Sequence, residues 1–89
     1  MLEEGKVYLV KTTRGSVWLF KKYSECFRNK MTSCYRSICL DDMYKTNTVG
    51  YICDNSNIVY IKEASDNYIS IWNREFNDNV ELRLIGMSK

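Results

Sequence analysis

The 89-residue sequence contains no histidine. This absence excludes Ser-His and Cys-His nucleophile pairs, imidazole ligands for zinc and the most common general base near neutral pH. Proline is absent too, so turns must be formed by Gly, Asn, Asp and Ser, and the four glycines do not make a Gly-rich phosphate loop. We therefore expect a protein that is not an enzyme and that uses no cofactor.

Long hydrophobic segments are also missing. The longest apolar runs have four residues, as in residues 17–20 (Val-Trp-Leu-Phe), whereas a helix needs roughly 20 to cross a bilayer. Glu3 and Glu4 stand near the start, where a secretory signal would carry positive charge. We expect a soluble protein located in the cytoplasm, without a membrane partner.

The four cysteines are too widely spaced for a typical zinc site. The gaps between them hold seven, four and thirteen residues, whereas structural zinc sites bring two ligands from each of two tight knuckles. We interpret them as reduced and mostly buried side chains, with disulfides as the alternative. They are Cys26, Cys34, Cys39 and Cys53.

Residues 54–57 (Asp-Asn-Ser-Asn) are similar to the start of a calcium-binding loop. The glycine and glutamate that such a loop needs at its sixth and twelfth positions are replaced by Val59 and Ser65. An ordinary turn explains these residues, so no metal site is expected.

Alternating apolar residues predict strands over most of the chain. Residues 6–12 and 17–23 form a predicted hairpin, and residues 32–40 form a third strand after an irregular segment at 24–31. Two further strands at 48–53 and 58–62 flank residues 54–57 and are expected to pair as a second hairpin. A last strand is predicted at 80–85.

The pattern becomes helical after Glu63. Ser65 is a candidate N-cap, and Ile69, Trp72 and Phe76 recur at the spacing of one helix face, which predicts an amphipathic helix of about three turns. We expect Trp72 in the core and Ile71 beside the apolar stripe.

Hydrophobic residues make up 45% of the sequence and charged residues 27%, which are typical values for a globular protein. A chain of this length forms one hydrophobic core, so we expect a single domain over 1–89. The predicted fold is α+β and mainly β. It is a small, strongly bent antiparallel sheet or an SH3-like or OB-like barrel of five to six strands, with one amphipathic helix near the C-terminus.

Four short segments together resemble small phage- or mobile-element-encoded proteins of gut bacteria. They are residues 4–11, 50–54, 61–65 (Ile-Lys-Glu-Ala-Ser) and 69–73 (Ile-Ser-Ile-Trp-Asn). In those proteins a strand ends in a charged residue, followed by Ala-Ser or Ala-Thr, an acidic helix start and an apolar helix. Here Asp66 is followed by Asn67, where two acids are usual. The resemblance implies an accessory protein of a mobile element and implies no active-site residue.

Positive charge is concentrated in the first part of the sequence. Between Lys6 and Arg36 there are eight basic residues and one acid, Glu25, whereas residues 46–89 carry four basic and six acidic residues. Aromatic residues are interleaved with the basic ones, as in proteins that bind single-stranded nucleic acid by stacking. Such asymmetry can steer docking onto a charged partner or promote head-to-tail self-association into a homo-oligomer.

The leading hypothesis is a non-enzymatic interaction protein, an accessory of a phage or mobile element, that binds a macromolecular partner through a sheet face or a basic hairpin. Inhibition of a host machine would suit such a protein. A protein partner is favoured, and nucleic-acid binding is the alternative. A third interpretation is that these residues are only a solvated hairpin edge, where lysine blocks aggregation. The candidate partner- or nucleic-acid-binding residues are Lys11, Arg14, Lys21, Lys22, Arg28, Lys30, Arg36 and Tyr23.

Overall fold

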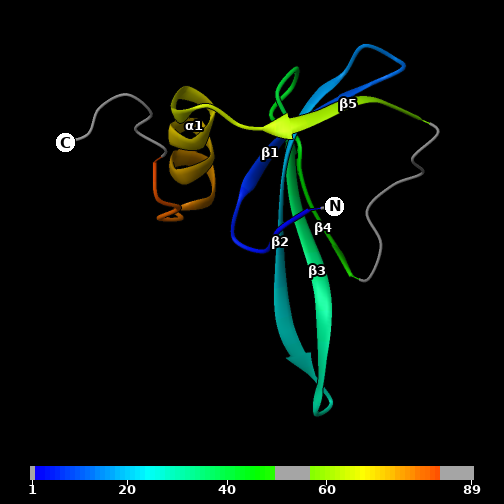
Figure 1. The fold of residues 1–89 in the computed structure, drawn as a ribbon, viewed down its shortest axis with the longest axis vertical. Coiled ribbons are helices and arrows are strands. Elements are labelled where there is room, and N and C mark those ends of the chain that lie inside the picture. Colours follow the sequence, from blue (N-terminus) through cyan, green and yellow to red (C-terminus); the bar gives the residue numbers. More distant parts are fainter. Residues whose placement is uncertain (1, 50–56, 83–89) are drawn as a thin grey trace.

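A computed structural model describes residues 2–49 and 57–82 of the chain. Five antiparallel strands form one open sheet in the order β4-β3-β2-β1-β5, and a single helix lies against it (Figure 1). The elements are β1 (Val7–Thr12), β2 (Val17–Phe27), β3 (Lys30–Cys39), β4 (Lys45–Val49), β5 (Ile58–Glu63) and α1 (Asp66–Phe76). The predicted α+β, mainly β class is confirmed. The sheet is open in the described residues, so the barrel alternative is not adopted.

The first hairpin follows the sequence pattern. Leu9 of β1 lies opposite Leu19 of β2, and the connection contains Gly15 at a φ of +86°, a conformation that glycine adopts without a side-chain clash. Successive side chains alternate between the two faces of the sheet, so Val7 and Leu9 point toward α1 while Tyr8 and Val10 point away from it. All four are buried, which explains why β1 is apolar on both faces.

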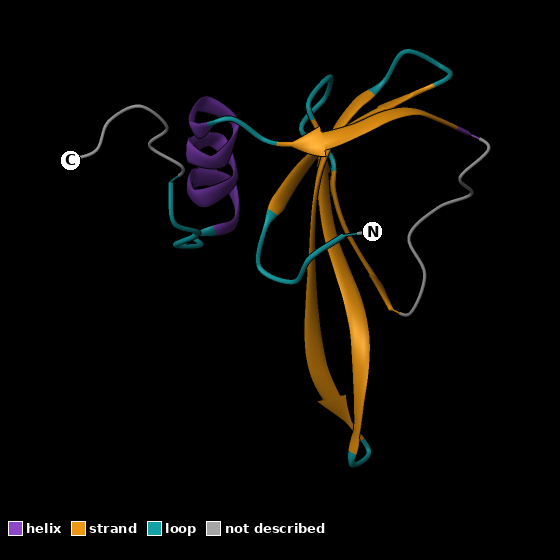
Figure 2. Cartoon of the chain, in the orientation of Figure 1, coloured by secondary structure: helices purple, strands orange, loops and turns teal. Residues whose placement is uncertain are grey.

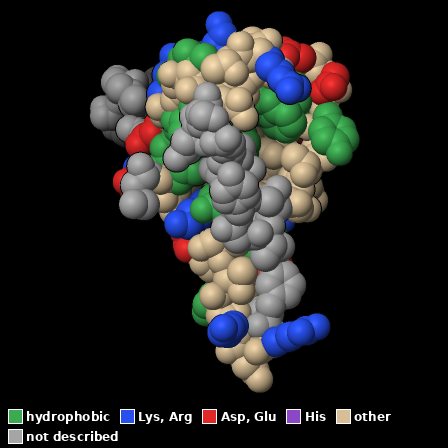
Figure 3. Space-filling view, turned by 90° about the vertical axis from the view of Figure 1, so that its right-hand side faces the viewer, with side chains coloured by type: hydrophobic (Ala, Val, Ile, Leu, Met, Phe, Trp, Pro, Cys, Tyr) green, Lys and Arg blue, Asp and Glu red, His purple; other side chains and the backbone are tan. Residues whose placement is uncertain are grey.

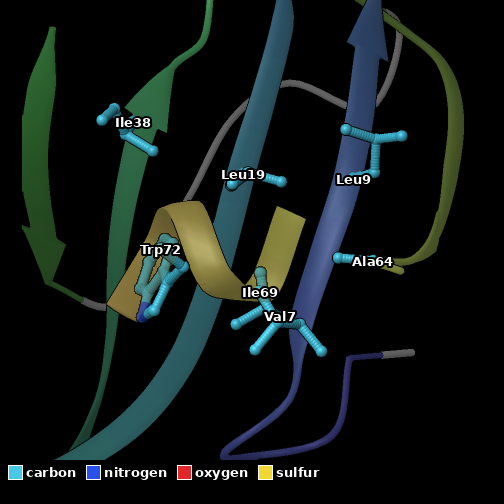
Figure 4. Close-up of a cluster of buried hydrophobic side chains, with 7 residues drawn as sticks. All are labelled: Val7, Leu9, Leu19, Ile38, Ala64, Ile69 and Trp72. Atoms are coloured by element: carbon cyan, nitrogen blue, oxygen red, sulfur yellow. The ribbon is translucent and has the colours of Figure 1, made fainter. Parts of the chain in front are cut away.

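The core lies between α1 and one face of the sheet. Trp72 has no exposed surface and Ile69 is buried, as the helical spacing predicts, and both belong to one cluster with apolar side chains of β1, β2 and β3 (Figure 4). The Phe76 ring continues this stripe, with its centroid 4.3 Å from that of Trp72. Ile71, beside the stripe, is half-buried. Figure 2 shows that the helix covers only one part of the sheet.

The irregular segment predicted at residues 24–31 is wrong. β2 continues to Phe27, and β3 begins at Lys30, so only Arg28 and Asn29 form the turn. Both turn residues have positive φ, 51° and 65°, as a two-residue hairpin turn with the twist of its strands requires. Asn readily adopts positive φ, but Arg seldom does. The pair is therefore not a typical turn sequence, and the turn is not predicted from it.

The second predicted hairpin is also wrong, because β4 and β5 lie at opposite edges of the sheet. β4 pairs with β3, whereas β5 pairs with β1 through pairs such as Val10 and Ile61. The eight residues between the two strands can span roughly 30 Å, which is enough to cross a five-stranded sheet. Residues 50–53 of the predicted strand and the turn residues 54–56 lie outside the described residues.

The strand predicted at 80–85 is not present in its described part. Residues 80–82 have no regular secondary structure, and residues 83–85 lie outside the described range. Asn77 ends α1 in the left-handed conformation, with a φ of 52°, and the chain then turns back so that Val80 packs against the core. Asn73 holds the segment after α1 in this position, because its side-chain amide donates one hydrogen bond to the backbone of Val80 and accepts another from it.

Candidate functional site

The β2–β3 hairpin extends beyond the rest of the sheet (Figure 1). β2 has 11 residues and β3 has 10, whereas the other strands have five or six. β1 pairs with β2 only as far as Lys21, and β4 pairs with β3 only from Cys34 onward. Residues 24–33, hereafter the distal hairpin, therefore pair only with each other in ladders of the described sheet.

The end of the distal hairpin is basic and exposed. Arg28 and Lys30 are both exposed, and Met31 beside them has 71% of its surface accessible. Figure 3 shows Lys and Arg side chains at this narrow end of the molecule. Glu25 is the only acid of the distal hairpin. The tip thus combines positive charge with an exposed flexible apolar side chain, a combination found at protein-binding surfaces.

Lys11, Arg14, Lys21 and Lys22 do not form one continuous surface with this tip. Lys11 lies opposite Val17, and Arg14 lies in the β1–β2 turn, at the opposite end of β2 from Arg28. Lys21 and Lys22 point to opposite faces of the sheet because they are adjacent in a strand. Lys11, Arg14, Lys21 and Lys22 thus all belong to the β1–β2 hairpin, but they are spread along its length and over both of its faces.

Lys21 is used inside the molecule. Its Nζ lies 2.6 Å from Oδ2 of Asp78, and the indole Nε1 of Trp72 donates to the same oxygen at 2.9 Å. Partial burial raises the pKa of Asp78, but the hydrogen bonds from Lys21, Trp72 and the backbone N–H of Asn79 outweigh it and lower the pKa from 3.8 to about 2. Lys21 is therefore a structural residue that joins the sheet to the end of α1.

Arg36 and Tyr23 lie together on the helix side of the sheet, where the hairpin passes the end of α1. The Arg36 guanidinium carbon lies over the Tyr23 ring, 5.1 Å from its centroid, and also over the Phe76 ring at 5.5 Å. Nζ of Lys45 lies 5.8 Å from the centroid of the same Phe76 ring. Phe76 is far from Arg36 in the sequence, so no local pattern predicts this arrangement. Tyr23, Arg36, Lys45 and Phe76 are hereafter called the Arg36 corner.

Several of the aromatic residues interleaved with the basic ones are used inside the fold. Tyr8 and Phe20 are buried, with exposed fractions of 7% and 8%. Trp18 is half-buried beside Phe20, with the ring centroids 6.1 Å apart, and the Tyr23 ring is already occupied by Arg36. Bases can stack only on rings whose faces are open, so Tyr8 and Phe20 cannot contribute to a stacking platform.

Other features of the described chain have structural explanations. Cys34 and Cys39 are buried free thiols, Cys26 is an exposed free thiol, and Cys53 lies outside the described residues. Within residues 2–49 and 57–82, no three Cys, Asp or Glu side chains are placed to hold a metal ion. A pocket of about 380 Å³ near the start of α1 contains Lys6, which already forms ion pairs with Glu3 and Glu63.

None of the described helices is long and apolar enough to cross a membrane. Comparisons of the chain with protein-family models, with curated proteins and with solved structures find no match.

Proposed function

We propose that this chain is a non-enzymatic interaction protein that binds an acidic surface of another protein through the distal hairpin. The observation that carries the proposal is the protruding β2–β3 hairpin, with Arg28 and Lys30 exposed at its end next to Met31. A projecting hairpin can enter a groove that a flat sheet face cannot reach. Charge complementarity would steer the encounter, and Met31 would supply apolar contact once water is excluded.

The limited exposure of the aromatic rings favours a protein partner over nucleic acid. Single-strand binders combine a basic groove with open aromatic faces, whereas here Tyr8 and Phe20 are buried and Tyr23 is covered by Arg36. Phosphate contacts by the tip alone would supply only sequence-independent electrostatic binding. The resemblance to small phage and mobile-element proteins supports an accessory role, for which blocking a partner's surface is a suitable activity.

Affinity capture in two parallel arms tests this proposal. The tagged protein is incubated with a bacterial lysate that is either treated with nuclease or left untreated, and the bound protein and nucleic acid are both quantified. We expect a stoichiometric protein that remains after nuclease treatment. If all capture disappears with nuclease, the distal hairpin is a nucleic-acid-binding element and the proposal is wrong.

A further inference from the structure

Arg36 differs from the cations around it because its guanidinium forms no ion pair with any residue that the structure describes. Lys21 is bonded to Asp78, and Lys45 lies 3.4 Å from the Glu75 carboxylate. The Arg36 guanidinium forms no hydrogen bond or ion pair with any residue in 2–49 or 57–82, although Arg36 is half-buried. A half-buried guanidinium without an acceptor is uncommon, because its five N–H donors lose part of their hydration.

The two aromatic rings hold this guanidinium in place. Tyr23 comes from β2 and Phe76 from the last turn of α1, so Arg36 joins the sheet to the helix through cation–π contacts. A guanidinium that lies over ring faces keeps its N–H groups at the edge of its plane. Because the two rings restrict where this side chain can lie, less side-chain entropy remains to be lost when an acceptor with two coplanar oxygens binds.

We propose that Arg36 is the anchor of the partner site and binds an oxyanion with two coplanar oxygens, a carboxylate of an Asp or Glu side chain on the partner. This inference rests on the proposed function, because it supplies the acidic partner. A phosphate group offers similar oxygens. Nucleic acid, which would bring such a phosphate, is disfavoured because the buried Tyr8 and Phe20 rings cannot stack with bases. The partner's carboxylate would pair the one cation of the Arg36 corner that the described chain leaves unpaired.

The position of Arg36 is compatible with one interface that also includes the tip. Arg36 and Lys30 both point to the helix side of β3, because they are separated by an even number of residues. They lie about 20 Å apart along the strand. A protein interface of about 800 Å² per partner is roughly 30 Å across and would cover both residues. A partner lying along the helix side of the hairpin would thus contact both the positive charge of the tip and the Arg36 guanidinium.

Titration of the ¹⁵N-labelled wild-type protein, followed through its arginine Nε–H signals and backbone amides, tests this inference. The probes are a hexaglutamate peptide, inorganic phosphate and sodium chloride at matched ionic strength. We expect the Arg36 Nε–H signal to move saturably with the peptide and at lower concentration than the Arg14 and Arg74 signals. Arg36→Lys keeps the charge but loses the planar fork, so we expect about tenfold weaker peptide binding, and no change for the control Arg14→Lys.

The possible outcomes separate this inference from the proposed function. If the peptide shifts the amides of Arg28 and Lys30 but leaves Arg36 Nε–H unmoved, the tip binds acidic protein and the Arg36 inference is wrong. If phosphate shifts Arg36 Nε–H at lower concentration than the peptide does, the carboxylate assignment is overturned. If chloride reproduces every shift, both proposals are wrong.

Discussion

Lys21 Nζ and Asp78 Oδ2 lie 2.6 Å apart and join the middle of β2 to the segment that follows α1. The two residues are 57 positions apart in sequence, and each side chain is less than one-fifth exposed. Trp72 donates its indole N–H to the same carboxylate oxygen. One carboxylate thus satisfies both a sheet cation and the largest core side chain, and fixes how the end of the helix lies on the sheet.

The Asp78 carboxylate should make the free energy of unfolding depend on acid. Its folded-state pKa of about 2 lies below the unfolded value of 3.8, so it stabilises the fold above pH 3.8, and this contribution is lost as the pH falls from 3.8 to about 2. The loss amounts to about 2 kcal/mol. Urea unfolding of the wild type and of Asp78→Asn at pH 6 and pH 2 measures it.

The control for this experiment is Glu81→Gln, which alters an exposed carboxylate in the same segment. The free energy of unfolding should fall more steeply with acid in the wild type and in the control than in Asp78→Asn. Equal acid dependence in all three proteins would show that the contacts with Lys21 and Trp72 do not lower the pKa of Asp78.

Replacing Trp72 should separate its two contributions to the fold. Trp72→Ala removes a fully buried ring and should lower the free energy of unfolding by about 3 to 5 kcal/mol. Trp72→Phe keeps most of the ring but removes the N–H that donates to Asp78, and should cost about 1 to 3 kcal/mol. Chemical denaturation followed by far-UV circular dichroism measures both. A Trp72→Phe protein as destabilised as Trp72→Ala would contradict this division.

The tip turn allows stability and binding to be changed in opposite directions. Arg28 and Asn29 both have positive φ, so the double substitution Arg28→Asn with Asn29→Gly introduces the residues that this turn favours. We expect the free energy of unfolding to rise by about 0.5 to 1 kcal/mol. Binding of the acidic partner should weaken at the same time, because Arg28 is removed.

Thermal unfolding and affinity capture of this double variant give the two readouts. Asn29→Val is the opposite control, because a β-branched side chain is strained at a φ of 65° and should destabilise the hairpin. A double variant that is less stable than the wild type would show that the turn does not adopt this conformation.

The sequence predicts the local elements of the fold well, because periodicity reports which side chains face the core. The stripe of Ile69, Trp72 and Phe76 predicts α1 and its buried face, and the alternation in β1 and β2 predicts their hairpin. The partner of β5 could not be predicted in this way. Pairing between β5 and β1 depends on which sheet edge is free, a property of the whole sheet that no local pattern contains.

The candidate site was predicted only as a group of residue types. The excess of basic residues is visible in the sequence, but its division into an exposed tip, the paired Lys21 and the Arg36 corner depends on strand register. Arg28 hides the turn because arginine seldom adopts positive φ, so the length of the distal hairpin was missed. Phe76 reaches Arg36, and Lys45 reaches the Phe76 ring, only through tertiary packing.

Affinity capture with charge-reversed variants tests the central claim most directly. Arg28→Glu with Lys30→Glu reverses the tip, and Lys62→Glu with Arg74→Glu makes the same change in net charge at exposed residues of β5 and α1. The wild type, the tip variant and the control variant are each incubated with nuclease-treated bacterial lysate, and the captured proteins are quantified. The account predicts a protein that the wild type and the control capture equally and the tip variant loses. Equal capture by the tip variant would show that the distal hairpin is not the binding element.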